Sequence, residues 1–149
     1  MRRYAVRLAL VLTLTLPGCA SWIQQFKDNP VLALQTNVQY ISTALSLARG
    51  AVAVYSAASG DTDIVTRFEQ VAGNVDRGLV VAQDGLRLAA HAGRTPDMTA
   101  LLRDATTAMR DVHAFLEGLP TPPGRAPTPM MVEALRATAQ AAGISGSGS

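Results

Sequence analysis

Apolar residues recur along most of this chain at alternating spacings of four and three, the period of one face of an α-helix. Over residues 31–58 the stripe is Leu34, Val38, Ile41, Leu45, Ala48, Val52 and Tyr55. Over 62–92 it is Ile64, Phe68, Val71, Val75, Leu79, Ala82, Leu86 and Ala89. A third stripe, up to residue 119, is Met98, Leu102, Ala105, Met109, Val112, Leu116 and Leu119. No segment alternates with the period of a strand, so the pattern predicts an all-α fold with three long helices.

Residues that start and stop helices divide these stripes. Ser59-Gly60-Asp61 interrupts the first stripe, the aspartates within 61–63 are cap candidates for the second helix, and Gly93 is expected to end it. We expect Thr95 to cap the third helix, with Pro96 at its first position and Asp97 at the positive end of its dipole. Because the links are short, consecutive helices are expected to pack antiparallel, as an up-down bundle over residues 31–119.

The C-terminal part of the chain predicts a shorter helix. Five of the eight prolines lie within residues 118–129, which indicates an extended linker at 120–128. Thr128-Pro129 then has the cap-and-proline signature of a helix over 129–142, followed by a flexible tail at 143–149 that Gly143 begins. The residues expected to face inward are Val132, Leu135, Ala139 and Ala142.

Three glycines, Gly73, Gly78 and Gly85, fall inside the second predicted helix. Each costs up to about 1 kcal/mol relative to alanine in a helix interior, so a compensating interaction is expected. Close approach of the alanine-rich first helix is the simplest interpretation. The alternative is a hinge or a π-bulge at a binding site.

The first nineteen residues have a different organisation. Arg2, Arg3 and Arg7 precede a nine-residue apolar run at 8–16, which has the layout of a secretory signal and is too short to cross a bilayer. The run ends in Leu16-Pro17-Gly18-Cys19, which resembles the lipobox of bacterial lipoproteins at Leu16, Gly18 and Cys19 and departs from it at Pro17. The alternative is an ordinary signal, or a buried strand with an incidental cysteine.

The resemblance implies a specific address. Cleavage would remove residues 1–18, and lipids on Cys19 would anchor a membrane-proximal segment at 19–30. Ala20, in place of the aspartate that retains lipoproteins at the inner membrane, implies the outer membrane of a Gram-negative cell, facing the periplasm. Trp22, Ile23 and Phe26 are then expected either in the headgroup zone or folded back as a cap on the core.

Loss of the signal changes the charge balance. The whole chain has 13 Lys+Arg against 11 Asp+Glu, and removing Arg2, Arg3 and Arg7 leaves 10 against 11. A nearly neutral domain gives no support for nucleic-acid binding. With its only cysteine lipidated, the chain has no thiol for a disulfide, a zinc site or a nucleophile.

Candidate catalytic groups are scarce. His91 and His113 belong to different helices, and no metal-binding spacing or glycine-rich phosphate loop is present. The carboxylates Asp104, Asp111 and Glu117 accompany Arg103 and Arg110, which indicates a solvated, salt-bridged face. We therefore expect no cofactor, no metal and no enzyme activity.

Three function classes fit these observations. The preferred one is a non-enzymatic envelope lipoprotein, a helical adaptor or assembly factor that binds a protein partner; in size, anchor and helicity it broadly resembles secretion-channel pilotins, without a shared motif. The alternative is a phage or prophage envelope lipoprotein for lysis or superinfection exclusion. The least favoured is a cell-wall enzyme, which would need paired carboxylates or a nucleophile in a cleft.

The first long helix is the expected partner site. Between Asn29 and Gly60 its only charged residue is Arg49, and Tyr40, Leu47 and Val54 form a second apolar strip at seven-residue spacing. One interpretation is that the bundle buries this helix at its centre. The other is that the uncharged strip docks a partner protein or a second copy of the chain.

Overall fold

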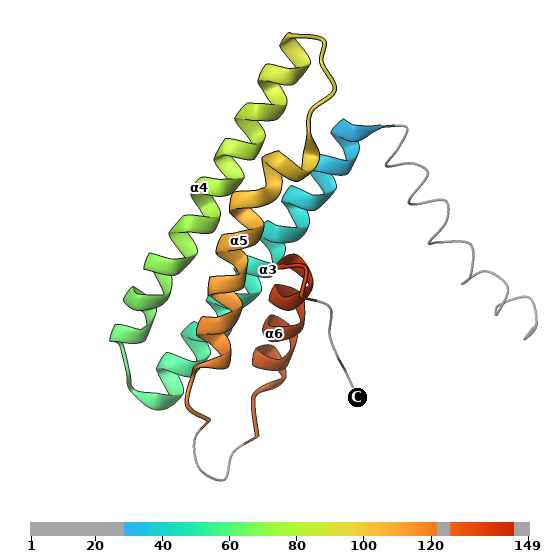
Figure 1. Ribbon diagram of the computed structural model, residues 1–149. Coiled ribbons are helices and arrows are strands. Elements are labelled where there is room, and N and C mark those ends of the chain that lie inside the picture. Colours follow the sequence, from blue (N-terminus) through green and yellow to red (C-terminus); the bar gives the residue numbers. More distant parts are fainter. Residues whose placement is uncertain (1–28, 122–125, 145–149) are drawn as a thin grey trace, which may run out of the picture.

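The computed structural model describes residues 29–121 and 126–144 and contains four helices, with no strand in those ranges (Figure 1). They are α3 (Pro30–Ser59), α4 (Asp63–His91), α5 (Met98–Glu117) and α6 (Pro129–Ala141). The predicted fold class is confirmed, because three long helices pack antiparallel and the short α6 completes the bundle. The predictions for the signal peptide, Cys19 and the aromatic residues after it lie outside the described residues.

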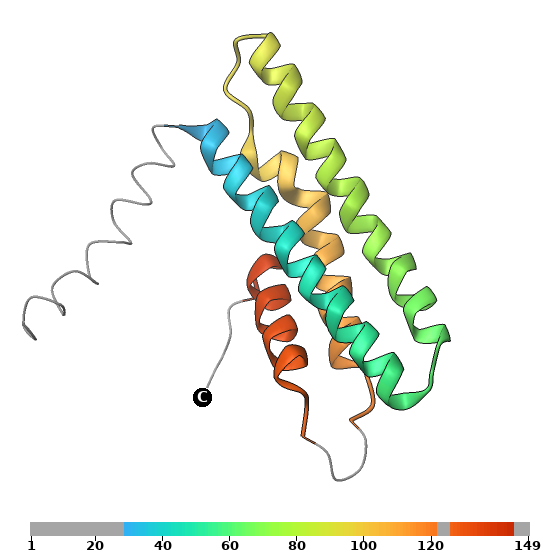
Figure 2. The ribbon, with the colours of Figure 1, turned by 180° about the vertical axis from the view of Figure 1, so that it is seen from behind.

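The fourth helix covers only part of the bundle. Figures 1 and 2 show α6 turning back antiparallel to α5 and lying beside the half of α3 that approaches the α3–α4 turn. It contacts α3 and α5 but not α4 within the described residues. One long side of α3 is therefore covered near its C-terminus and left uncovered near its N-terminus.

Side-chain caps start the helices, as expected, with one correction. Asp61 Oδ1 accepts hydrogen bonds from the backbone of Asp63 at 3.1 Å and of Ile64 at 3.3 Å. Thr128 Oγ1 accepts from Met131 N at 3.2 Å, which confirms the predicted cap of α6. The predicted cap at Thr95 is wrong: α5 begins at Met98, and Asp97 Oδ1 accepts from Ala100 N at 3.0 Å. A carboxylate satisfies the free N–H and also complements the positive helix end.

Glycines end three of the helices. Gly60, Gly93 and Gly143 have φ values of 76°, 60° and 67°, in the left-handed region that glycine adopts without a Cβ penalty. After α4, Arg94 N donates to Ala89 O at 2.9 Å and Gly93 N to Ala90 O at 3.2 Å, the two bonds of a Schellman motif. The predicted stops at Gly93 and Gly143 are confirmed. The third helix ends at Glu117, two residues before its expected end.

The predicted stripes of the three long helices form the core. The largest fully buried side chains are Phe68, Leu34, Leu45, Met109, Val52, Val75, Val112 and Thr138. Phe68 also packs edge-on against Phe115, with ring centroids 5.5 Å apart.

The predicted inward face of α6 is wrong by about one residue. Val132 is 44% exposed, and of the four expected residues only Ala142 is buried. The buried face consists of Met131, Ala134, Ala137, Thr138 and Ala141. Small side chains let α6 lie close to its neighbours, so the largest apolar side chains do not mark the contact face of this helix.

Two of the three glycines of α4, Gly78 and Gly85, lie against α5, and not against the first helix as expected. An alanine Cβ at Gly78 would lie 2.6 Å from the backbone nitrogen of Ala105 and 2.7 Å from its Cα. A Cβ at Gly85 would overlap the Leu101 side chain, whereas one at Gly73 would have no neighbour within 4 Å. Close approach is thus the reason for Gly78, but its partner is α5. Since α4 is α-helical throughout, no π-bulge is present in it.

Candidate functional site

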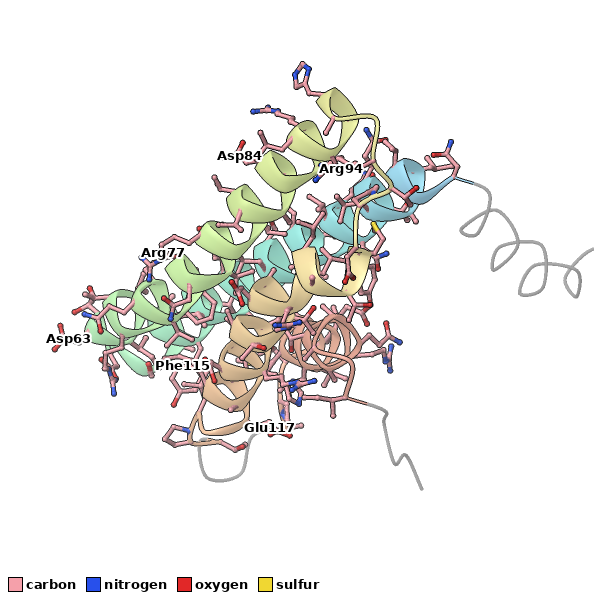
Figure 3. All side chains as sticks on the ribbon, turned by 45° about the horizontal axis from the view of Figure 1, so that its top comes forward. Asp63, Arg77, Asp84, Arg94, Phe115 and Glu117 are labelled. Carbon is pink, nitrogen blue, oxygen red and sulfur yellow. The ribbon has the colours of Figure 1, made fainter. Side chains whose placement is uncertain are left out.

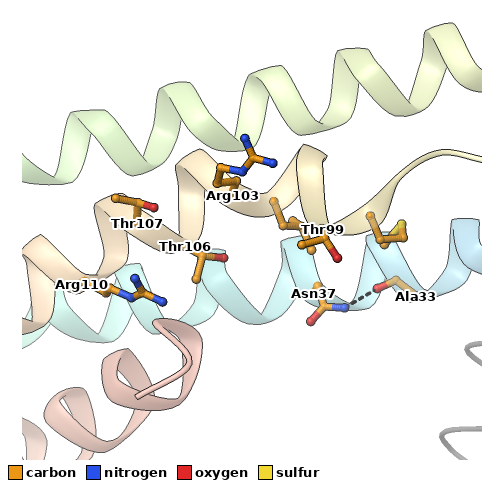
Figure 4. Close-up of a pocket in the computed structure, with 9 residues that line it drawn as sticks. Ala33, Asn37, Thr99, Arg103, Thr106, Thr107 and Arg110 are labelled. Atoms are coloured by element: carbon orange, nitrogen blue, oxygen red, sulfur yellow. Dashed lines mark hydrogen bonds between the residues drawn. The ribbon is translucent and has the colours of Figure 1, made fainter. Parts of the chain in front are cut away.

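A groove between α3 and α5 combines charged and apolar groups. One half of it holds α6. The other half is open, with a volume of about 560 Å³ (Figure 4). Its apolar lining residues are Ala33, Met98 and Leu102. Its polar lining residues are Asn37, Thr99, Thr106, Thr107, Arg103 and Arg110. We call these nine residues the open groove.

Hydrogen bonds at the end of α6 show that the filled and open halves are continuous. Arg110 Nε donates to Ala142 O at 3.1 Å, just after the last residue of α6. On the opposite wall the Tyr40 hydroxyl donates to Gln140 Oε1. Asn37 lies one turn before Tyr40 on α3 and lines the open groove. The open groove therefore begins where α6 ends.

Regular spacing on the two long helices builds the walls. On α5, Thr99, Arg103, Thr106 and Arg110 recur at steps of four, three and four, so they share one side of the helix. On α3, Ala33 and Asn37 continue toward the N-terminus the same face that carries Tyr40. In Figure 4, Thr99, Thr106 and Arg110 extend from α5 toward the α3 side, while Arg103 lies toward α4 and forms the outer rim.

The open groove carries positive charge and hydrogen-bond donors. No carboxylate is among its lining residues, which include two arginines and three threonine hydroxyls. Asn37 Nδ2 donates to Ala33 O at 2.9 Å, so the amide is held against its own helix. Arg103 and Arg110 make no ion pair with a carboxylate in the described part of the chain. The groove thus offers unneutralised guanidinium groups beside an apolar floor.

The expected salt bridges between these arginines and the neighbouring aspartates are absent from the described residues. Arg103 precedes Asp104, and Arg110 precedes Asp111. Consecutive residues on a helix point about 100° apart and do not face each other. Asp104 and Asp111 border a shallow depression between α4 and α5, and Arg103 lies at the edge that this depression shares with the open groove. Arg110 lines the open groove and not the depression. In the described residues neither arginine pairs with a carboxylate, so both can contact a ligand in the open groove.

The structure places the predicted partner strip largely against α6. Tyr40 donates to Gln140, and Leu47 is partly buried against the core. Val54 is 40% exposed and borders an apolar cavity of about 160 Å³, which Met131 and Leu135 of α6 also line. Within the chain, then, α6 uses this strip of α3. Binding of another protein to these three residues stays a prediction.

The only charge on α3 between Asn29 and Gly60 forms an ion-pair network with α4. Arg49 Nη2 lies 2.9 Å from Glu69 Oε2 and 2.8 Å from Asp76 Oδ2. Hydrogen bonds to Glu69 and then Asp76 raise the pKa of Arg49 above its ordinary value. The exposed face of α3 consequently presents no unpaired charge in the described residues.

The helix α3 is also long and apolar enough to cross a membrane. In its most apolar stretch, within Val31–Ser59, 33% of the residues are buried in the bundle. The core helix of a soluble protein can have the same length and composition, so this property is weak evidence for a membrane span.

A buried polar pair escaped the sequence analysis. His113 Nδ1 lies 3.0 Å from Thr138 Oγ1, linking α5 to α6, and both residues are buried. The Thr138 hydroxyl also lies 2.8 Å from Ala134 O of its own helix. The position of His113, four residues after Met109 and three before Leu116, could have indicated an inward histidine. Because Thr138 is 0% exposed, its contact with His113 links α5 to α6 inside the bundle.

Of the remaining candidate groups in the described residues, only His113 and Glu117 come together, with His113 Nε2 lying 3.4 Å from Glu117 Oε1. His91 is the last residue of α4 and is exposed, far along the chain from the buried His113. Across residues 29–121 and 126–144, no three His, Cys, Asp or Glu side chains gather as a metal site. No protein-family model, curated protein or solved structure matches the chain, so its geometry alone supports the assignment of the site.

Proposed function

We propose that this protein is a lipid-anchored adaptor of the bacterial cell envelope, which binds a partner protein and catalyses no reaction. The partly filled groove between α3 and α5 carries the proposal. Its closed half already holds one helix, α6, and none of the described residues covers the same α3 face in its open half. Grooves that receive an amphipathic helix are a recurrent mode of protein recognition.

The anchor is Cys19, and it places the domain at the periplasmic side of the outer membrane. The segment before Cys19 supports this, through its resemblance to a lipoprotein signal. Ten residue steps separate Cys19 from Asn29, which allows a reach of about 35 Å. The open groove lies at the end of the bundle where α3 begins, so the partner binds close to the membrane.

Replacement of Cys19 tests the proposed localisation. We expect Cys19→Ser to abolish palmitate labelling and to release the protein from the membrane, because no second lipid attachment site exists in the sequence. The double variant Cys19→Ser/Ser21→Cys restores a thiol two residues away and is expected to remain unlabelled. Labelling of Cys19→Ser would contradict the lipoprotein assignment. An unlabelled variant that resists extraction from the membrane would instead indicate that α3 crosses it.

Chemical crosslinking tests the adaptor function. Formaldehyde treatment of cells that make the full-length protein is expected to give a discrete adduct with one partner protein, visible after denaturing purification. The Cys19→Ser protein, released from the membrane, is expected to give much less of it. Absence of any protein adduct with the anchored wild type would refute the adaptor proposal.

A further inference from the structure

We infer that the open groove binds an acidic helix of the partner protein, laid end to end with α6 between α3 and α5. This inference rests on the proposed adaptor function and adds to it the binding site and the chemistry of the partner. Two observations on the described residues carry it: the shape of the groove and its unneutralised charge.

The filled half of the groove defines what fits the open half. There α6 packs a face of alanines and one threonine against α3 and α5, and Tyr40 and Arg110 hold its C-terminal turn. Ala33 and Asn37 extend the same α3 face by two further turns. From Thr99 to Arg110 the α5 wall is about 17 Å long, which corresponds to three turns of a bound helix.

Charge complementarity selects an acidic helix. Arg110 lies inside the open groove and Arg103 at its outer rim, seven residues apart on α5 and about 10 Å along its axis. Two carboxylates seven residues apart on a bound helix have the same axial separation, so one can face Arg110 in the groove and the other Arg103 at the rim. Since the lining holds no carboxylate, such a helix encounters attraction without competing repulsion.

The floor of the open groove favours a helix over a lipid headgroup or an acidic polysaccharide. Ala33 is 6% exposed, and it lies with Met98 and Leu102 beneath the polar rim. These residues offer apolar surface to the small side chains of a helix, as the neighbouring half of the groove does to α6. The threonine hydroxyls at Thr99 and Thr106 supply neutral donors between the two arginines.

Site-specific photocrosslinking in cells that make the full-length, anchored protein tests the inference. Benzoylphenylalanine replaces Thr99 in the open groove, or Val80 on α4 as the control. Val80 is 56% exposed and lies between Arg77 and Asp84, which project outward from α4 in Figure 3. We expect a protein adduct from position 99 and none from position 80. The crosslinked peptide is expected to come from a helix with two carboxylates seven residues apart.

Charge reversal provides the second measurement. Arg103→Glu leaves every hydrogen bond within the described chain intact, and it should lower the yield of the adduct at position 99 by about tenfold or more. Arg110→Glu should act similarly, but it also removes the bond to Ala142 O, so Arg103→Glu decides the result. Arg87→Glu, at the border of α4 with the other side of α3, makes the same change in net charge and should leave the yield unchanged. Replacing the partner carboxylate by arginine should restore the adduct with Arg103→Glu.

The outcomes of these experiments distinguish this inference from the adaptor proposal on which it rests. The inference is overturned if position 99 gives no adduct, if the adduct is a lipid, a polysaccharide or a second copy of this chain, or if Arg103→Glu has no effect. In each case a formaldehyde adduct of the wild type with a different protein would leave the adaptor proposal standing. Failure of both crosslinking experiments would refute both.

Discussion

Replacement of Gly78 by alanine probes the closest helix–helix contact in the bundle. The new Cβ would lie 2.6 Å from the nitrogen and 2.7 Å from the Cα of Ala105. Carbon atoms pack at about 3.5–4.0 Å, so α4 and α5 would have to separate by about 1 Å over this contact. Because backbone atoms of α5 are involved, no rotation of a side chain can relieve the overlap.

Two opposing effects set the size of the change. Alanine is the better helix former and stabilises the folded state by about 1 kcal/mol relative to glycine. Overpacking of a rigid contact costs about 3 kcal/mol at the upper end of its usual range. The variant is therefore expected to lose about 2 kcal/mol of unfolding free energy, which lowers the melting temperature by about 8 °C in a domain of this size.

Gly73→Ala is the matched control. It lies in the same helix, and its new Cβ would have no neighbour within 4 Å. It should keep the helix-propensity gain and raise the unfolding free energy by up to about 1 kcal/mol. Urea and thermal unfolding of both variants, followed by far-ultraviolet circular dichroism, measure the difference. If Gly78→Ala equals or exceeds Gly73→Ala in stability, the described α4–α5 distance is wrong.

Two further replacements test polar links between helices. Thr138→Val leaves His113 Nδ1 without its hydrogen-bond partner in the core and should cost about 2 kcal/mol in urea unfolding, whereas Thr138→Ser should retain most of the stability; equal values for both would refute the bond. Arg49→Gln should cost about 0.5–1 kcal/mol, a small value because its partners Glu69 and Asp76 are about half exposed, and high salt should narrow the difference from wild type. A salt-independent loss would instead indicate that Arg49 stabilises through packing.

The fold was predictable where large apolar side chains carry the signal. In the three long helices Leu34, Phe68 and Met109 lie on the longest apolar stripes, and all three are fully buried. The ends were predictable because a left-handed residue after a helix strongly favours glycine, as at Gly93 and Gly143. These signals are local, and tertiary contacts do not reverse them.

The errors share one physical origin. The inward face of α6 is made of alanines and Thr138, whose burial depends on how closely another helix approaches. Nothing in the spacing of α6 records that distance. Gly78 shows the same limit, since its sequence context indicated close approach but could not say that α5 was the neighbour. The periodicity of a sequence describes a single helix, whereas the contact face of a helix depends also on the helix that packs against it.

The open groove could not be predicted from the sequence, for a related reason. Arg103 and Arg110 stand beside aspartates in the sequence, which suggested a neutral, salt-bridged surface. Helical geometry turns each arginine away from the aspartate that follows it, so that both arginines also border the groove between α3 and α5, which the aspartates do not line. Predicting this requires knowing which two helices flank α6, and chain order allows several answers.

The low charge of α3 is unexpected for a helix that its neighbour covers only in part. A 30-residue helix packed against a 13-residue one leaves part of its length uncovered by that neighbour, and such a surface is normally charged. In α3 the covered strip and the uncovered one are the same face: Ala33 and Asn37 continue the line of Tyr40 and Leu47. An acidic residue at position 33 or 37 would pair with the arginines of α5 and close the groove. A basic residue there would repel them and open the groove further. An uncharged wall leaves Arg103 and Arg110 free for carboxylates supplied by another chain.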